Sequence, residues 1–512
     1  MTLKNALKIT NNFLEILLAT FPKLSLFLAG GLAKFCFCKE YSFPILAWPM
    51  FAVLLTVLIN SKLNKSFSIG FCFGTGYFGS SLYWIAESFK CVGLGNYGYV
   101  AVVLLVLYLS IYSAAACFLT KRFSRTRLNF LILFASFWTL MEYARGIIFT
   151  GFPWNLIGYA TYNIPFFPQI ADIFGVYGVS FIFVLIVAFL TNKKTMPWGL
   201  AIFSAILIYG YYKINIYDGY IVPKEQCLTR IVQPSIKQED KMDLTKFKKN
   251  LQKHITLSGL SSNIYKGKML IAWPEAAINI PTTPKNGILN YVSSKLPDDT
   301  YIIAGRDKIE QNRVYNGACV IGKKEGILQS YEKRHLLPFG EFIPEFLLNL
   351  GLRKVTPGIV NFTKGTSTRT IKIDGFNKFD VVICYEAVFP GEILDDPDSG
   401  WILNITNDAW FKDSDGPAQH LTAACFRAIE EGRAVVRVAN NGISCVIDCN
   451  GRFQQRLETD EVGKIDVNMP SKYCSTFFSK HKNKTVLILI TVLIISLLIR
   501  GYVFAPPYRQ NA

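Results

Sequence analysis

The chain has 512 residues, of which 51% are hydrophobic and only 18% are charged, and a composition this apolar excludes an ordinary soluble protein of this size. The formal net charge of +18 is typical either of nucleic-acid binding or of basic loops that face anionic lipid. The sequence contains no base-reading motif, so its apolar composition favours a membrane partner and no nucleic acid.

Eight apolar stretches are long enough, or nearly so, to cross a hydrocarbon core of about 30 Å. They predict eight transmembrane helices, at about residues 24–38, 43–59, 67–86, 98–120, 128–149, 173–190, 198–212 and 485–499. The first stretch has no small-residue cleavage site behind it, so we expect no removable signal peptide.

The loops between these stretches differ in their content of lysine and arginine. Loops 60–66, 121–127 and 192–197 together hold eight basic residues. The alternate loops, 39–42, 87–97 and 150–172, hold two. Because basic loops stay on the cytoplasmic side, we expect both termini in the cytoplasm and the long segment after the seventh helix outside it.

The segment from about residue 215 to 484 has a different character, because short β-branched runs alternate with polar or helical stretches. This alternation predicts one α/β globular domain of ordinary size. We therefore predict three parts, which are a transmembrane helical domain at 1–214, a catalytic domain at 215–484, and a C-terminal helix with a cytoplasmic tail at 485–512.

The chain has twelve cysteines, and several of them lie inside apolar runs. Their spacing matches neither a disulfide scaffold nor the paired CxxC pattern of a zinc site. We expect most of them to be small buried side chains and predict no metal site.

Three short segments of the α/β part each place a reactive side chain after a predicted strand or in a loop. They are Trp273-Pro274-Glu275, the segment from Tyr331 to His335 with Lys333, and the segment from Val382 to Glu386 with Cys384. Strand ends often bring distant residues together in a site. Taken singly, Cys384 also suits a buried strand cysteine, Lys333 a solvated basic loop, and Glu275 the start of a helix.

The three residue types are sufficient for acyl transfer. A thiol attacks an acyl carbon only as the thiolate, so Cys384 needs a neighbouring base, and Glu275 is a candidate for that base. Lys333 and a backbone N–H near Tyr385 are candidates to stabilise the oxyanion that develops.

Seven motifs, in this order, resemble the nitrilase superfamily and, within it, the apolipoprotein N-acyltransferases. They are TGFPW at 150–154, WPEAA at 273–277, EKRHLLPFGEFIP at 332–344, ICYE at 383–386, TNDAWF at 406–411, GPAQH at 416–420 and NNG at 440–442. The resemblance covers nearly the whole chain and implies an αββα sandwich with Glu275 as the base, Lys333 as the triad lysine and Cys384 as the nucleophile. Many relatives carry a tryptophan where this chain has Met242.

The resemblance also implies the reaction. An acyl chain would pass from a phospholipid, through a Cys384 thioester, to the α-amino group of the diacylglyceryl-cysteine of an apolipoprotein. This is the last step of bacterial lipoprotein maturation, and it would take place at the periplasmic face of the inner membrane without any cofactor. Two alternatives stay open, a membrane-tethered amidase that uses water and a lipid-binding scaffold or transporter with an inactive enzyme domain.

Further residues are candidates for supporting roles. By the resemblance, Glu341 and Glu386 would orient the triad or position the substrate, and the alternative for each is a surface carboxylate. His335 and His420 are expected to be structural, because the triad needs no histidine.

Two aromatic segments suit a lipid substrate. The run Phe342–Leu348, with Phe342 and Phe346, would be a costly apolar patch in water and is a candidate to enter the membrane interface. The loop with Trp154 lacks lysine and arginine and is a candidate aromatic rim, with packing between domains as the alternative. Within the membrane, Glu142 and Arg145 lie three residues apart on one helix and are expected to neutralise each other.

Overall fold

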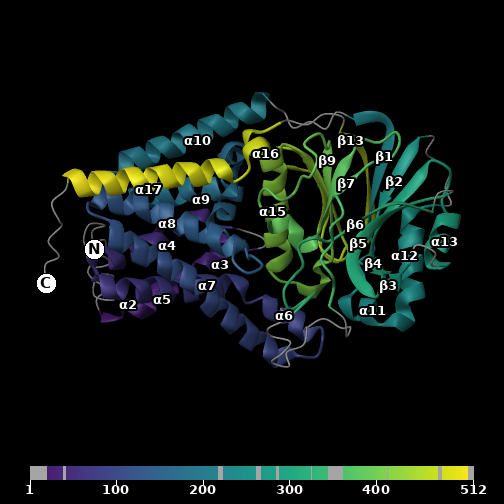
Figure 1. The fold of residues 1–512 in the computed structure, drawn as a ribbon, viewed down its shortest axis with the longest axis horizontal. Helices are drawn as coiled ribbons and strands as arrows, with labels where there is room; N and C mark the ends of the chain where they lie inside the picture. Colours follow the sequence, from purple (N-terminus) through teal and green to yellow (C-terminus); the bar gives the residue numbers. More distant parts are fainter. Residues whose placement is uncertain are drawn as a thin grey trace, which may run out of the picture.

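The computed structural model describes residues 20–38, 42–216, 223–260, 267–283, 287–323, 326–343, 361–411, 413–470 and 475–504. Within these residues a bundle of helices lies on one side of the molecule and an α/β domain on the other (Figure 1). The α/β domain therefore meets the bundle at one end of its long helices.

All eight predicted stretches are helical. The bundle elements are α2 (Pro22–Gly31), α3 (Ala33–Cys36), η1 (Pro44–Leu46), α4 (Ala47–Asn60), α5 (Leu63–Leu82), α6 (Ile85–Lys90), α7 (Gly95–Phe123), α8 (Arg127–Ile147), η2 (Ile157–Asn163), η3 (Phe167–Ile170), α9 (Ala171–Leu190), α10 (Met196–Ile216), α16 (Phe477–His481) and α17 (Lys484–Phe504). Among the described residues, four helices are long and apolar enough to cross a membrane, namely Gly95–Phe123, Arg127–Ile147, Phe167–Leu190 and Met196–Ile216. The prediction of a membrane protein is thus supported, whereas the count of eight spans stays a prediction.

The first predicted span differs from the structure, because residues 24–38 form two short helices instead of one. Helix α2 ends at Gly31 and α3 begins at Ala33. The pair Gly30-Gly31 disfavours a continuous helix. Gly30 also allows close packing against α5, since a Cβ there would lie 2.2 Å from the carbonyl oxygen of Phe73.

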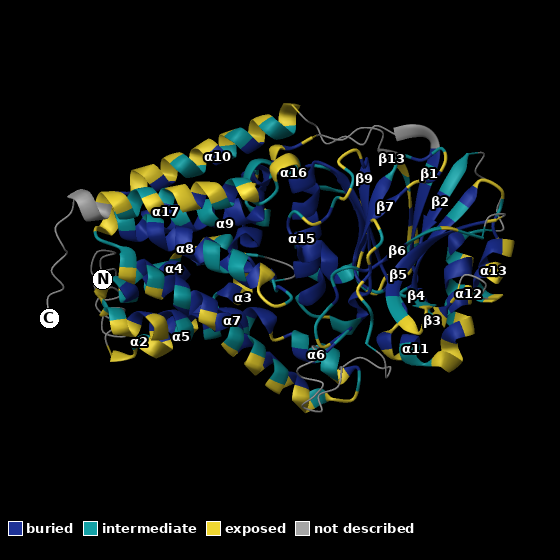
Figure 2. Cartoon of the chain, in the orientation of Figure 1, coloured by how far each residue is buried: buried dark blue, intermediate teal, exposed yellow. Residues whose placement is uncertain are grey.

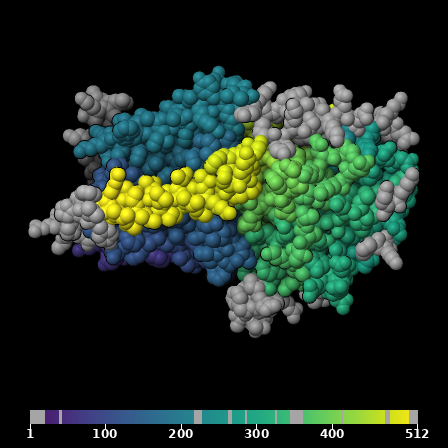
Figure 3. All heavy atoms as spheres, turned by 45° about the horizontal axis from the view of Figure 1, so that its top comes forward, coloured from purple at the N-terminus to yellow at the C-terminus, as the bar shows by residue number. Residues whose placement is uncertain are grey.

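Large apolar side chains cover the outer surface of the bundle. Helix α17, yellow in Figure 3, lies along this surface, and Ile488 and Val492 on it are 62% and 60% exposed. Trp198 and Ile216 at the two ends of α10 are 68% and 69% exposed. Such a surface is stable only in contact with lipid or with another apolar surface.

The α/β domain contains two sheets. The first sheet has the order β13-β1-β2-β4-β5-β6, with β3 beside β4, and the second has the order β12-β11-β10-β9-β8-β7. The strands are β1 (Pro223–Gln233), β2 (Lys268–Ala272), β3 (Ile278–Thr282), β4 (Thr300–Glu310), β5 (Arg313–Gly322), β6 (Gly326–Glu332), β7 (Thr370–Ile371), β8 (Phe379–Ile383), β9 (Trp401–Thr406), β10 (Ala434–Ala439), β11 (Ser444–Ile447), β12 (Phe453–Leu457) and β13 (Gly463–Pro470). In the first sheet β2 pairs in parallel with β1 and β4, and in the second β9 pairs in parallel with β8 and β10. Every residue of β8, β9 and β10 is buried, as is typical of parallel strands.

The two sheets pack face to face around a fully buried core that includes Leu270, Ile303, Val381 and Leu403. Helices α12 (Phe247–Ser258) and α13 (Gly287–Ser294) cover the outer face of the first sheet, and α15 (Gly416–Glu431) covers that of the second (Figure 1). The predicted αββα sandwich is therefore confirmed.

Helix α15 lies between the second sheet and the bundle, and it is dark blue along most of its length in Figure 2. Phe426 on α15 packs edge to face against Tyr159 of the bundle, with ring centroids 5.2 Å apart. The Glu430 carboxylate accepts a hydrogen bond of 2.7 Å from the backbone N–H of Val176, which follows the kink of α9 at Gly175. Helix α15 is buried on nearly all sides and joins the two domains, because Phe426 belongs to the core of the bundle and Ala424 to the core on the outer face of the second sheet.

Candidate active site

The structure brings Glu275, Lys333 and Cys384 together from three strand ends. Glu275 follows β2, Lys333 follows β6, and Cys384 follows β8. The Lys333 ammonium lies 3.6 Å from the Glu275 carboxylate, and both side chains are buried. The Cys384 thiol lies within electrostatic range of both groups.

Hydrogen bonds from distant segments fix the Glu275 carboxylate. Asn316 on β5 donates its side-chain N–H to Oε1 at 2.8 Å, and the backbone N–H of Asn407 donates to Oε2 at 2.9 Å. Gly305 allows the Glu275 loop to lie on β4, because a Cβ there would be 2.6 Å from the Glu275 Cα. The sequence had not pointed to Asn316, which belongs to none of the motifs.

Lys333 is held by a second carboxylate. Its ammonium lies 3.0 Å from Oε1 and 2.9 Å from Oε2 of Glu341. Burial lowers the pKa of Lys333, but the carboxylates of Glu341 and Glu275 outweigh burial and hold that pKa above the usual lysine range. Lys333 is therefore a permanent ammonium group at neutral pH. Glu341 is 8% exposed, so it is not the surface carboxylate that the sequence left open.

Cys384 has a strained backbone, because its φ of +48° lies in the left-handed region that residues other than glycine rarely adopt. It begins η5 (Cys384–Val388), directly after β8. Burial raises the pKa of the Cys384 thiol, Glu275 raises it further, and Lys333 offsets them only in part. The resting group is thus a neutral thiol that needs a base before it can attack an acyl carbon.

Glu386 fixes the backbone around two of the three residues. It is 1% exposed, so the surface alternative does not apply. Its carboxylate accepts hydrogen bonds of 2.7–3.1 Å from the Tyr331 hydroxyl, the Arg369 guanidinium and the backbone N–H groups of Arg334, His335 and Ile383. Burial raises the pKa of Glu386, but Arg369 and these donors outweigh burial and lower that pKa. Protein groups thus contact both oxygens of Glu386, and its role toward the triad or the substrate stays a prediction.

Tyr385 connects the site to the bundle. Its hydroxyl donates a hydrogen bond of 2.9 Å to the carbonyl of Gly151, and its ring stacks on Trp154 at 6.3 Å. His335 contacts the carbonyl of Thr150 at 2.6 Å through Nε2. The loop before η2 therefore lies against the segments that carry Lys333 and Cys384. The role of the Tyr385 N–H toward an oxyanion stays a prediction.

Trp154 lies between the domains and not on an exposed rim. It is 5% exposed, and its indole N–H donates to Gln419 on α15 at 2.9 Å. Trp154 thus packs between the two domains, which is the alternative that the sequence left open. Its contact with lipid stays a prediction. Phe342 is half-buried, and Phe346 lies outside the described residues.

Glu142 and Arg145 do more than neutralise each other. Their charged groups lie 4.0 Å apart. The Arg145 guanidinium also donates to the carbonyls of Phe152 and Trp154, at 2.6 and 2.7 Å, and Glu142 accepts from the backbone N–H of Ile157 at 2.8 Å. Both side chains thus hold the loop before η2 in place, and the Tyr385 hydroxyl donates its hydrogen bond to this loop.

His420 contacts the backbone of the candidate nucleophile. Its Nε2 lies 3.0 Å from the Cys384 carbonyl, and its Nδ1 lies 3.0 Å from the Asp408 carboxylate. Arg437 and His420 lower the pKa of Asp408 to about 2 against the opposing effect of burial. These contacts are compatible with the structural role expected for His420, which stays a prediction.

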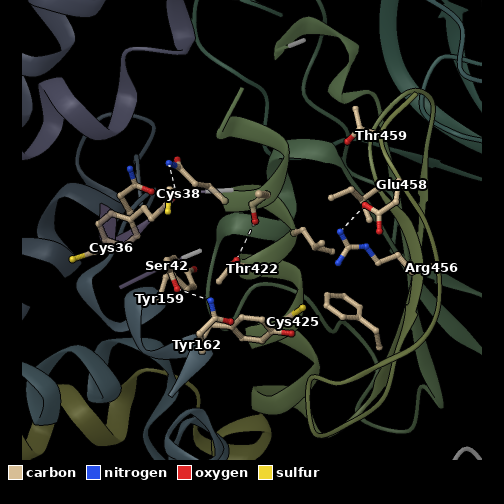
Figure 4. A pocket seen from close by; sticks show the side chains of 18 residues that line it. Cys36, Cys38, Ser42, Tyr159, Tyr162, Thr422, Cys425, Arg456, Glu458 and Thr459 are labelled. Carbon is tan, nitrogen blue, oxygen red and sulfur yellow. Dashed lines mark hydrogen bonds and ion pairs between the residues drawn. The ribbon is translucent and has the colours of Figure 1, made fainter. Parts of the chain in front are cut away.

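A cavity of about 570 Å³ lies elsewhere on the domain boundary, between the bundle, α15 and β12 (Figure 4). Tyr159, Tyr162, Gln419, Thr422 and Arg456 are among its lining residues. Glu275, Lys333 and Cys384 do not line it. The cavity is therefore separate from the three candidate catalytic residues.

Comparisons with known proteins match both parts of the chain. The model of the apolipoprotein N-acyltransferase N-terminal domain matches residues 29–189, and the carbon-nitrogen hydrolase model matches residues 228–477. Proteins named apolipoprotein N-acyltransferase are similar in Brucella melitensis, with 32% identity over 93% of this chain and 92% of the relative, and in Rickettsia bellii, with 33% identity over 92% and 96%.

Solved structures match about half of the chain at low identity. A CN-hydrolase superfamily protein of Xanthomonas campestris is 15% identical over 51% of this chain and 96% of its own, with a TM-score of 0.35. Nit3 of Saccharomyces cerevisiae, a nitrilase superfamily member, is 16% identical over 56% and 98%, also with a TM-score of 0.35. The sequence relatives span both domains, and on their similarity the chain belongs to the apolipoprotein N-acyltransferase family.

Proposed function

We propose that the chain transfers an acyl chain from a membrane phospholipid, through a thioester on Cys384, to the α-amino group of the S-diacylglyceryl-cysteine of apolipoproteins. The family to which it belongs is that of the lipoprotein N-acyltransferases. The observation that carries the proposal is the convergence of Glu275, Lys333 and Cys384 beside the bundle.

In the first half-reaction the Glu275 carboxylate accepts the proton of the Cys384 thiol. The thiolate then attacks the ester carbonyl of the phospholipid, and the Lys333 ammonium stabilises the oxyanion. When the carbonyl re-forms, the C–O ester bond breaks and the leaving alkoxide takes the proton from Glu275. A lysophospholipid departs, and the acyl group remains on sulfur.

In the second half-reaction the neutral amine of the lipoprotein attacks the thioester carbonyl. Glu275 accepts the proton that the nitrogen loses, and Lys333 again stabilises the oxyanion. The C–S bond breaks, the sulfur recovers a proton from Glu275, and an amide is formed. Both half-reactions therefore use the same three residues, as a ping-pong mechanism requires.

The contacts of Glu341 and Glu386 support positioning roles. Glu341 fixes the Lys333 ammonium, and Glu386 fixes the backbone on either side of Cys384 and Lys333. The first N–H groups of η5, that of Tyr385 included, are assigned to the oxyanion together with Lys333. These residues preorganise the charge before either substrate arrives.

The membrane setting supports a phospholipid as the acyl donor. We assign eight spans and place the catalytic domain on the periplasmic side of the inner membrane, because the basic loops favour that orientation. The proposed division is a helical domain at 1–214, a catalytic domain at 215–484 and a C-terminal helix with its tail at 485–512. Phe342, Phe346 and Trp154 are assigned to the acyl-chain path, where apolar side chains would exclude bulk water from the thioester.

The test is to incubate the purified protein with phospholipid alone and then to add a diacylated lipopeptide. A stoichiometric, hydroxylamine-sensitive acyl adduct on Cys384 should appear first by mass spectrometry and should vanish as triacylated peptide forms. Cys384→Ala should give neither signal, whereas the matched Cys425→Ala should keep both, because Cys425 is a buried thiol on α15 away from the triad. An adduct that is lost to water without peptide acylation would support an amidase, and no adduct would contradict the thioester.

A further inference from the structure

A second lysine is buried beside Glu275. Lys241 belongs to the short helix α11 (Gln238–Met242) and is only 6% exposed. Its ammonium donates a hydrogen bond of 2.7 Å to the backbone carbonyl of Glu275. Lysine is almost never buried this far without a partner that needs its charge. Neither the motifs nor the proposed mechanism gives Lys241 a role.

Helix α11 is tied to the loops that surround Glu275. The side chain of Gln238 accepts a hydrogen bond of 2.9 Å from the amide of Asn407, whose backbone N–H donates to the Glu275 carboxylate. Asn279, in β3, donates to the carbonyl of Lys241. Both ends of the Lys241 backbone segment are thus fixed relative to Glu275, so the ammonium has a defined place in the site.

The buried cluster around Lys333 holds more negative than positive charge. Glu275 and Glu341 contribute two negative charges to the buried cluster, and Lys333 supplies one positive charge. Lys241 adds a second positive charge to these groups, and its charge acts on Glu275, Cys384 and the further carboxylate of Asp307. An uncompensated charge in a buried site is costly, and that cost would grow as the thiolate and the oxyanion form.

We propose that Lys241 is a second cationic positioning residue, which holds the Glu275 loop in place and compensates the negative charge of Glu275 and Cys384 during acyl transfer. The proposal rests on the proposed thioester mechanism. Lys333 stabilises the oxyanion directly, whereas Lys241 acts through the backbone and the charge of Glu275.

The burial of Lys241 gives this role a signature in the pH profile. Burial lowers the pKa of Lys241 to about 8, although Glu275, Asp307 and Cys384 oppose the shift. His254, on α12, also faces this lysine, and burial lowers its pKa to about 3, so it stays neutral across the range. The ammonium is therefore present at pH 7 and is lost as the pH rises through about 8.

The experiment measures how fast phospholipid alone forms the acyl adduct between about pH 6 and pH 9.5. This half-reaction involves no acceptor amine, so titration of the amine cannot distort the profile. Lys241→Met removes the donor and the charge, Lys241→Gln keeps a donor without the charge, and Lys241→Arg keeps both. The matched control is Lys246→Met, which changes an exposed lysine in the next segment, η4 (Leu244–Lys246).

We expect the Met and Gln variants to form adduct roughly tenfold more slowly, or worse, at pH 7, and the Arg and Lys246→Met variants to stay within several-fold of wild type. The wild-type rate should fall above about pH 8, and the Arg variant should lack this fall because its guanidinium stays charged. The comparison of wild type with Lys241→Arg holds even if Lys241→Met fails to fold.

A Gln variant at the wild-type rate, or a wild-type rate that is flat up to pH 9.5, would overturn the role of Lys241 while the adduct itself still supported the thioester. No adduct in the wild-type protein would overturn the thioester mechanism and this role together. The two failures are therefore distinguishable.

Discussion

Changing Glu386 to glutamine tests the claim that this residue holds the active site together. The Glu386 oxygens meet five donors, and all four donors other than Ile383 reach Oε1. In Glu386→Gln the amide can keep its oxygen toward those four only by turning its NH₂ toward the Ile383 N–H. One buried N–H then faces another donor, and the charge of Arg369 loses its carboxylate partner.

The loss of stability expected for Glu386→Gln follows from the unsatisfied N–H and the weakened bond to Arg369. An unsatisfied buried N–H costs about 1–3 kcal/mol, and a charge-assisted hydrogen bond is worth about twice a neutral one, so the substitution should destabilise the domain by roughly 3 kcal/mol. At about 2–4 °C per kcal/mol for a domain of this size, the unfolding midpoint should fall by roughly 6–12 °C. Adduct formation should slow as well, because Ile383 directly precedes Cys384 and its backbone N–H would lose the carboxylate that holds it in place.

The assay is thermal unfolding of the detergent-solubilised protein, with Asp374→Asn as a matched acid-to-amide control in the exposed ion pair with Lys268. Because the pKa of Glu386 is lowered in the folded state, its stabilisation is present above the ordinary glutamate pKa of about 4.3 and is lost as the pH falls below it. The difference between wild type and variant should therefore shrink at acid pH. A variant midpoint within about 2 °C of wild type at neutral pH would refute the reasoning.

Three further results are expected. Lys333→Met should slow adduct formation by about 10²–10³-fold in the phospholipid-only assay, because the oxyanion loses its buried cation, and a change below threefold would contradict that role. Trp154→Ala should destabilise the protein by about 3–5 kcal/mol in thermal unfolding, and Trp154→Phe by less, about 1–3 kcal/mol, since phenylalanine keeps an aromatic ring near Tyr385 but loses the bond to Gln419 and part of the buried ring volume. Reporter fusions at Asn290 should be active only with an outward-facing reporter, and a cytoplasmic signal would reverse the assigned orientation.

The sequence by itself determined the architecture and the three candidate catalytic residues. Long apolar runs predict helices wherever lipid replaces water, because every backbone group must then be bonded within its own segment. Short β-branched runs predicted β2, β8 and β9; Cys384 follows β8 directly, and Glu275 comes shortly after β2. The helices and strands are local features of the chain, whereas the three candidate residues were recognised from the order of seven motifs along nearly the whole chain.

The tertiary structure decided how those residues are held and which neighbours they have. Trp154 is buried because Gln419, 265 residues further along the chain, reaches it from α15. Asn316 and Lys241 touch Glu275 from β5 and α11, 41 and 34 residues away, in segments with no recognisable motif. The sequence left a surface carboxylate open as the alternative for Glu386, and only the approach of Arg369 and four other donors makes it buried and charged. Burial and electrostatic compensation are properties of the groups that meet in space, and no local pattern of residue types encodes which distant groups will meet.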